Sequence, residues 1–231
     1  MRISIRIMAI VFAVLLCFVF LLSSIRYVAF NQDIYRKIQV KQKIADFVLM
    51  PQESLDEVTI GLIEYMKGER KDIVFFSDYN ENKTELFNDR EKMHMEDVQE
   101  LFDISLTVII VALCLLMLIL IAGFLMDMEI MKEIFIKTAT ITMVIVVLLF
   151  IMSIFYLIAD FYNVWMFLHE MVFTNDLYFL DPYTDLLVNI MSLDFFVSIC
   201  LHVGLYFGLL FIALFVMMCG TKLTKKVIKS E

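Results

Sequence analysis

The stretch IMAIVFAVLLCFVFLL at residues 7–22 decides the fold, because it is apolar without interruption. A helix needs about 20 predominantly apolar residues to cross a bilayer, so we expect a transmembrane helix over 5–28. The run is too long for the apolar region of a signal peptide, and no typical cleavage site follows it. Three more stretches, 104–126, 138–159 and 195–220, contain no Asp, Glu, Lys or Arg. The sequence therefore predicts an all-α integral membrane protein with four transmembrane helices.

The composition supports this class. Apolar residue types make up 61% of the 231 residues, including 22 Phe and 17 Met, whereas soluble domains contain about 45–50%. A soluble domain could not bury that much apolar surface, and a disordered chain would be poor in such residues. The net charge of −8 argues against a nucleic-acid partner. All four cysteines lie in apolar runs without metal-ligand spacing, so we expect neither disulfides nor a metal site.

The basic residues predict the orientation. They precede the first span, separate the second from the third, and follow the fourth: Arg2, Arg6, Lys132, Lys137, Lys222, Lys225, Lys226 and Lys229. Because loops rich in Lys and Arg stay inside, both termini, the short 127–137 loop and the 221–231 tail should be cytoplasmic. The segments 31–103 and 160–194 should then lie outside. The second of these contains six acidic residues and no Lys or Arg, which agrees with that placement.

The segment 31–103 is too long for a bare loop and predicts a small extracytoplasmic domain. Ser54 and Glu57 have the spacing of a capping box, and Gly68 is a plausible end for the helix that follows. The runs 73–76 and 84–87 favour a β-hairpin around a turn at 80–82. A further helix should begin at Asn88 or Asp89 and continue into the second span.

The segment 160–194 is too polar to span a membrane and too aromatic for an ordinary solvated loop. Six aromatic residues in it suit the membrane–water interface: Trp165, Phe167, Phe173, Tyr178, Phe179 and Tyr183. We therefore expect an interfacial helix over 161–174. Asp176, Asp181 and Asp185 have no basic residue nearby in sequence, so they require partners, water or a cation.

The chain has only three histidines, and the surroundings of each indicate what it could do. Glu91, His94 and Asp97 are spaced three apart and share one side of a helix, where two carboxylates would raise the imidazole pKa. The alternative is an ordinary charged helix surface, which the spacing alone favours. His202 lies inside the fourth span, where a neutral imidazole bonded to another helix is the simplest expectation. His94 and His169, both in outer segments, could perform acid–base chemistry on a lipid-linked ester or amide.

Two stretches carry a family resemblance. Residues 87–98, FNDREKMHMEDV, resemble the signature F-N-x-R-E-x-x-H-M-x-D-V of the bacterial lipoprotein intramolecular transacylases, the Lit family. The second stretch runs from FLH at 167–169 through FTND at 173–176 and DP at 181–182 to DLL at 185–187 and FF at 195–196. The four spans agree as well. The departures, Leu168 for an expected Phe and no Pro before Phe195, remove no candidate catalytic group.

The resemblance implies a specific reaction. Such enzymes move the sn-2 acyl chain of a diacylglyceryl lipoprotein to the α-amine of its N-terminal cysteine, which gives a lyso-form lipoprotein. The substrates would be diacylated bacterial lipoproteins in membrane lipid, at the outer face of the cell membrane, without a cofactor or metal. His94 would be the general base, oriented by Glu91 or Asp97, and His169 would stabilise the oxyanion or act as acid, with the two roles open to reversal. Asp176 and Asp185 would be anchors or supporting groups.

Two other functions fit the residues alone. A non-enzymatic membrane partner would act through its ectodomain and would form no product. A small transporter would relay ions or protons through ionisable side chains, namely Asp160, His169, Asp194 and His202. The near absence of charge within the spans argues against transport.

Overall fold

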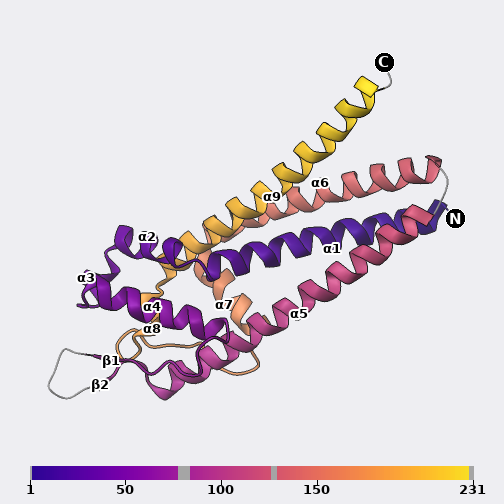
Figure 1. Cartoon of the computed structure of the whole chain (residues 1–231). Helices are drawn as coiled ribbons and strands as arrows, with labels where there is room; N and C mark the ends of the chain where they lie inside the picture. The colour runs from indigo at the N-terminus through magenta and orange to yellow at the C-terminus, as the bar shows by residue number, and fades with distance from the viewer. Residues whose placement is uncertain (1, 78–83, 126–128, 229–231) are drawn as a thin grey trace.

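The computed structural model describes residues 2–77, 84–125 and 129–228. Four long helices form a bundle: α1 (Arg2–Ala29), α5 (Asp89–Leu125), α6 (Glu129–Ala159) and α9 (Leu193–Ile228). At one end of this bundle, Figure 1 shows a cluster of shorter elements, here called the head. The head contains α2 (Gln32–Gln42), α3 (Ile44–Phe47), α4 (Gln52–Met66), β1 (Phe76–Ser77), β2 (Thr84–Glu85), α8 (Leu187–Ile190) and the first turns of α5.

The first helix holds the bundle together, because α1 packs against α5, α6 and α9. Ala9 and Ala13 of α1 are buried against Ala139 of α6, and such small side chains let two helices approach closely. Further along α1, Val19 packs on Ile109 and Ala112 of α5. Packing in this bundle therefore depends on small and medium apolar side chains on one central helix.

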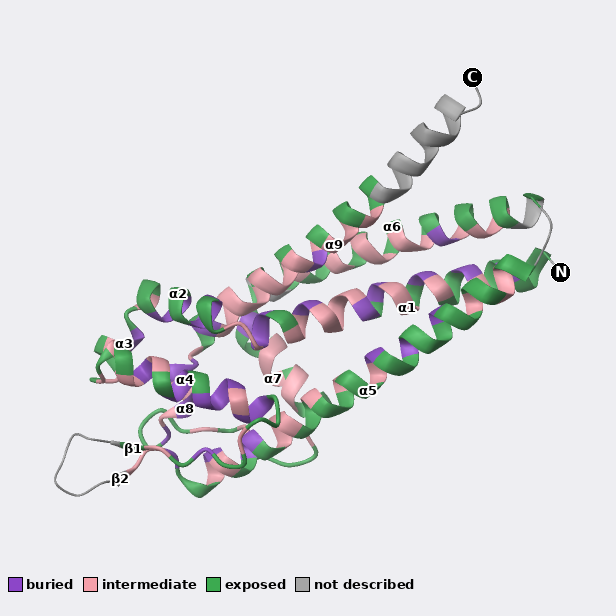
Figure 2. Cartoon of the chain, in the orientation of Figure 1, coloured by how far each residue is buried: buried purple, intermediate pink, exposed green. Residues whose placement is uncertain are grey.

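All four long helices are long and apolar enough to cross a membrane. In the most apolar part of each, at most 28% of the residues are buried inside the protein. Figure 2 shows the consequence as long exposed stretches on α5, α6 and α9. Side chains this apolar need lipid around them, so the expectation of an all-α protein with four membrane helices is confirmed. The predicted edges of the spans remain predictions, since no membrane is present.

The head has its own apolar core. Leu55 and Leu62 of α4, Phe87, Ile190 of α8 and Phe195 are all at most 1% exposed. These residues come from segments more than 100 positions apart, so the core joins the 32–103 region to the 186–196 region. Figure 2 shows the buried positions concentrated along α4. The head and the bundle share this core through the start of α9.

One helix start differs from the prediction. The expected capping box at Ser54 and Glu57 is wrong, because α4 begins at Gln52 with Pro51 at the N-cap position. Proline has a backbone φ that suits the start of a helix, and here it starts α4 before Ser54. The predicted end at Gly68 is confirmed. Gly68 has a φ of +76° and its N–H donates to the carbonyl of Tyr65 at 2.8 Å, which is part of a typical glycine-terminated helix end.

The predicted hairpin exists but is shorter than expected. Strands β1 and β2 pair antiparallel, with Phe76 opposite Glu85 and Ser77 opposite Thr84. The predicted turn at 80–82 lies outside the described residues. The hairpin is fastened to α5 by Lys92, whose ammonium lies 2.6 Å from the Glu85 carboxylate.

The segment after α6 contains the predicted helix. Helix α7 (Phe161–Val172) begins directly after Asp160 and packs against α6 and α9. Phe167 and Met171, one turn apart, are more than 60% exposed, so α7 presents an apolar face to its surroundings. Residues 173–186 then run as a connection without a regular helix to α8. This connection crosses the N-terminal part of α5, as the contacts described below show.

The head core predicts the effect of a single truncation. Leu62→Ala removes a fully buried side chain and should destabilise the protein by about 3 kcal/mol, the usual cost of such a cavity. The control is Ile60→Ala in the same helix, where the side chain is 37% exposed. Thermal unfolding of the full chain in detergent should show a lower midpoint for Leu62→Ala only. Equal midpoints for the two variants would contradict the described core.

Candidate active site

The structure brings together two histidines that are 75 positions apart in sequence. His94 lies in the second turn of α5 and His169 in the last turn of α7, with ring centroids 6.2 Å apart and ring planes tilted by 32°. This separation is too long for a direct hydrogen bond between the rings. The Phe173 ring lies 5.3 Å from His94 and 5.6 Å from His169, so it contacts both.

The neighbours of His169 define its protonation pattern. Its Nδ1 lies 2.8 Å from the carbonyl oxygen of Trp165, which can only accept a hydrogen bond. Nδ1 therefore carries the proton, and Nε2 of the neutral ring keeps a free lone pair. The Trp165 ring lies edge-on to His169 at 4.7 Å and is itself stacked on Phe196 at 4.3 Å. His169 is thus held in an orientation that suits a base.

His94 is buried, and its Nδ1 has no hydrogen-bond partner among the described residues. Its pKa is lowered to about 4, mainly by burial and also by the neighbouring His169, while Asp97 opposes the shift. The expectation that nearby carboxylates raise this pKa is therefore wrong, because loss of hydration outweighs the attraction of Asp97. Burial also lowers the pKa of His169. Both imidazoles are neutral at pH 7.

The Glu91 carboxylate bonds backbone N–H groups, although His94 is only three residues away. The Glu91 side chain is 1% exposed, and its two carboxylate oxygens accept hydrogen bonds from the backbone N–H groups of Asn88 (2.8 Å) and Leu187 (2.6 Å). Asn88 Oδ1 accepts in return from the Glu91 N–H at 3.1 Å, which completes a capping box at the start of α5. Burial raises the Glu91 pKa. Glu91 therefore joins the starts of α5 and α8.

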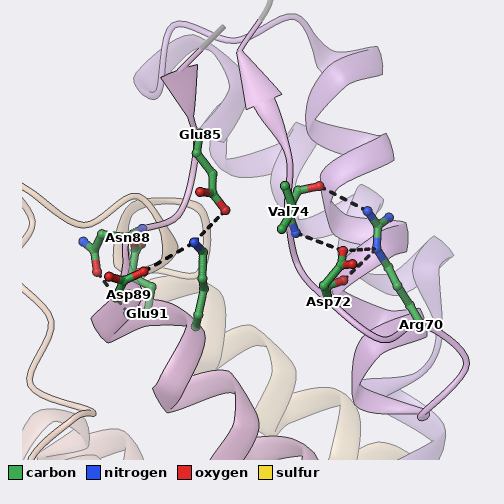
Figure 3. Close-up of polar contacts among 8 residues, drawn as sticks. Arg70, Asp72, Val74, Glu85, Asn88, Asp89 and Glu91 are labelled. Carbon is green, nitrogen blue, oxygen red and sulfur yellow. Dashed lines mark hydrogen bonds and ion pairs between the residues drawn. The ribbon is translucent and has the colours of Figure 1, made fainter.

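Asp185 is the second buried anchor. It accepts hydrogen bonds from the Asn88 side chain at 2.8 Å, the Asp181 N–H at 2.7 Å and the Thr184 hydroxyl at 2.9 Å. Burial alone would raise the pKa of Asp185, but these donors outweigh it and the net shift is downward. The carboxylate stays ionised and binds the 181–185 turn to the cap of α5. Figure 3 shows Asn88 beside Asp89 and Glu91 at this helix start.

Asp97 and Asp176 lie near the histidines but contact other groups. Asp97 Oδ2 accepts from the side-chain amide of Asn175 at 2.9 Å. The Asp176 side chain is 83% exposed, and its backbone carbonyl accepts from Arg90. Sequence reasoning named both aspartates but missed Arg90 and Trp165. Arg90 was detectable, since it lies one helical turn before His94, whereas the contact between Trp165 and His169 required the packing of α7.

The residues of the suggested transport relay do not form a connected chain. His202 Nδ1 bonds the Ser198 carbonyl of its own helix at 2.8 Å, not another helix as expected. Asp160 accepts from the Asn163 side chain at 2.8 Å at the start of α7. Among the side chains that the structure describes, no group of three His, Cys, Asp or Glu could hold a metal ion. The histidine pair is therefore the strongest candidate for chemistry.

A cavity of about 650 Å³ lies elsewhere, between the end of α1, the start of α2 and α4. Its polar lining includes Arg26, Lys67 and Glu64, and neither His94 nor His169 borders it. The Arg26 guanidinium also donates to the Ser105 hydroxyl at 3.0 Å and so ties α1 to α5. This cavity brings together no nucleophile and base, so the candidate active site is the histidine pair.

The two lowered pKa values can be measured directly, because the chain has three histidines. In the protein labelled with ¹⁵N-histidine, His94 should stay neutral down to about pH 4 and His169 should titrate below 6.5. His169→Phe should raise the His94 pKa, because the charge of the neighbouring imidazolium is removed. A His94 that titrates at or above 6.5 would contradict the buried arrangement.

Comparisons with known proteins agree with this architecture. Residues 10–196 match the family described as lipoprotein intramolecular transacylase Lit. The fold is similar to the solved structure of the membrane-integral lipoprotein intramolecular transacylase Lit from Bacillus cereus, with a TM-score of 0.72 at 16% identity, covering 97% of this chain and 100% of that one.

Two variants of the Bacillus cereus protein, with one histidine replaced by arginine or by alanine, have also been solved. Each matches with a TM-score of 0.69 at 15% identity; the arginine variant covers 96% of this chain and 95% of its own, and the alanine variant 96% of both. No curated protein sequence matches. Since the family match spans most of the residues, this chain belongs to the Lit family of lipoprotein intramolecular transacylases.

Proposed function

We propose that this protein moves the sn-2 acyl chain of a diacylglyceryl lipoprotein to the α-amine of its N-terminal cysteine, which leaves a lyso-form lipoprotein. The observation that carries the proposal is the pair His94 and His169, which come from different helices and face each other across 6.2 Å. Family membership supplies the reaction class. The pair supplies the acid–base groups that an acyl transfer needs.

The lone pair on His169 Nε2 supports this histidine as the base, the reverse of the assignment first expected from sequence. A free α-amine has a pKa of about 7.7–8.0, and its nitrogen becomes far more acidic once it bonds to the ester carbonyl carbon. His169 Nε2 then takes the proton that the positively charged nitrogen must lose after the new C–N bond has formed. The hydrogen bond from Nδ1 to Trp165 stabilises the imidazolium that forms.

His94 is then the partner that stabilises the oxyanion. A neutral imidazole can donate one N–H, and at His94 it is surrounded by apolar rings and by the second histidine. A hydrogen bond to a developing negative charge is strong in such a dry environment. When the tetrahedral intermediate collapses, the glycerol oxygen leaves and takes the proton from the imidazolium. The products are an amide and a free hydroxyl group.

The mechanism requires neither an acyl-enzyme nor a cofactor, because the substrate contains both the nucleophile and the ester. Positioning alone can lower the barrier by several kcal/mol when both groups belong to one molecule. The exposed apolar face of α7, with Phe167 and Met171, supports a place at the membrane interface. There the substrate's glycerol would sit beside the histidines and its acyl chains would remain in the lipid.

The distribution of basic residues supports an active site on the outer face of a bacterial cell membrane. Lys132 and Lys137 lie near the α5–α6 end of the bundle, opposite the head, and we place that end together with both termini in the cytoplasm. The head is then extracytoplasmic. This is the side on which lipoproteins emerge.

The central prediction concerns the histidines. Expressed in a bacterium that lacks such an enzyme, the chain should convert a diacyl reporter lipoprotein to the lyso form, as measured by mass spectrometry of its N-terminal peptide. His94→Ala and His169→Ala should each reduce conversion at least about 100-fold, the usual contribution of an acid–base group. His202→Ala, outside the pair, is the control and should convert normally.

The same experiment tests the alternative. Unchanged diacyl termini, with the protein folded in the membrane, would remove the transacylase proposal. Stoichiometric co-purification of another protein in that case would favour the non-enzymatic membrane partner. Full activity of both histidine variants would show that the pair has only a packing role.

The orientation can be tested with two single cysteines in a background without native cysteines. Lys71→Cys lies on the exposed surface of the head, and Glu129→Cys on the α5–α6 side, where the Glu129 side chain is 95% exposed. A membrane-impermeant maleimide added to intact cells should label position 71 and leave position 129 unlabelled until the cells are lysed. Labelling of position 129 alone in intact cells would reverse the proposed orientation.

A further inference from the structure

A short segment after α7 lies against the histidine pair. The Tyr178 ring is 5.1 Å from the His169 ring, and Tyr178 also stacks on Phe173 at 6.1 Å. Residues 173–180 contain no helix or strand, and the hydrogen bonds among them, such as that from the Phe179 N–H to the Asp176 carbonyl at 3.1 Å, are local and do not tie the segment to the histidine pair. The contacts that hold the segment must come from elsewhere in the protein.

Arg90 supplies the first of these contacts. Its Nε donates to the carbonyl of Phe179 at 3.1 Å, and a terminal guanidinium nitrogen donates to the carbonyl of Asp176. The same nitrogen lies 4.0 Å from the Asp176 carboxylate. One guanidinium therefore bonds the backbone on both sides of Tyr178. A planar group with several donors can make both hydrogen bonds at once, whereas a side chain with a single donor atom cannot.

Asp97 supplies the second contact, through its 2.9 Å hydrogen bond with Asn175. Arg90, His94 and Asp97 follow one another at spacings of four and three, which places them on one side of α5. His94 thus lies between the two residues that fasten the segment. Both fastening contacts involve ionised groups, and such hydrogen bonds are stronger than neutral ones.

We propose that Arg90 and Asp97 are positioning residues, which hold the segment 175–179 against the histidine pair and so keep Tyr178 packed on His169. The proposal deepens the proposed function and rests on it for its effect on activity. The fastened segment keeps Tyr178 on the His169 ring at 5.1 Å, and the Trp165 ring contacts the same imidazole at 4.7 Å. It also limits access of water to the two imidazoles.

A different role for Asp97 would be electrostatic, with its carboxylate stabilising a charged His94 directly. The fastening role and the electrostatic role predict different results for two Asp97 variants. The amide oxygen of Asp97→Asn can still accept from Asn175, so this variant preserves the fastening and removes the charge. Asp97→Ala removes both.

The activity test compares rates of reporter conversion. Arg90→Gln should slow conversion about tenfold or more, because small misplacements at a reacting centre are costly, and Arg90→Lys should recover part of the loss. Asp97→Ala should be slower than Asp97→Asn. The matched control is Arg70→Gln: Arg70 also donates to two backbone carbonyls, those of Asp72 (2.7 Å) and Val74 (3.2 Å), but in the head (Figure 3).

The second readout does not depend on catalysis. Trp165 is the only tryptophan of the chain and lies beside His169, so protonation of His169 should quench its fluorescence. The charged or titratable groups around the pair are Arg90 and Asp97 on α5, Glu170 on α7, and Asp176 and Tyr178 in the segment. In the unmodified protein the midpoint of quenching should lie below pH 6.5, because His169 is partly buried.

Release of the segment should change the pH midpoint of fluorescence quenching in a predictable direction. Asp97→Ala removes a negative charge, which alone would lower the midpoint, whereas water reaching a released His169 would raise it toward 6.5. The proposal therefore expects a higher midpoint in Asp97→Ala and Arg90→Gln, and little change in Arg70→Gln. A lower midpoint in both Asp97 variants, or equal conversion by Arg90→Gln and the unmodified protein, would overturn it. Absence of lyso product from the unmodified protein would instead remove the proposed function and leave the fluorescence result standing.

Discussion

The structure around the histidines depends on one buried carboxylate. Glu91 accepts backbone hydrogen bonds from the start of its own helix and from the start of α8, 96 positions away. A buried carboxylate costs free energy unless donors compensate it, so this residue is stable only where the two helix starts meet. Helix N-termini favour negative charge, which gives Glu91 a second reason to lie there. Because α8 is fixed in this way, the preceding connection has to pass over α5 at the level of His94.

The environment of the two histidines fits the acid–base roles proposed for them. His94 is buried and His169 is partly buried, so each ring prefers to be neutral. A neutral imidazole provides both an acceptor and a donor, which is what a proton transfer between an amine and an alcohol requires. The aromatic contacts continue from His169 through Trp165, Phe196 and Phe195 into the head core. The orientation of His169 is thus supported by the same core that stabilises the head.

Much of this arrangement could be predicted from the residue pattern, and some could not. The four membrane helices follow from uninterrupted apolar runs, because lipid leaves a chain few other ways to satisfy its backbone. The cap at Asn88 follows from local residue types, whereas the one at Ser54 failed because Pro51 starts α4 earlier. The hydrogen bond from Leu187 to Glu91 lay beyond any local pattern, since Leu187 reaches this carboxylate only through tertiary folding. The lowered His94 pKa was missed for the same reason: spacing shows the carboxylates nearby but not the burial.

Helix α5 anchors the head on one side and presents His94 on another. Glu91 and Met95, one turn apart, point into the core of the head, and both are at most 3% exposed. Arg90, His94 and Asp97 occupy a different side of the same helix and contact the segment after α7. A helix anchored on one side holds the groups on its other side in fixed register, because its backbone hydrogen bonds leave little freedom within a turn. His94 therefore acquires a precise position although its buried Nδ1 has no hydrogen-bond partner among the described residues.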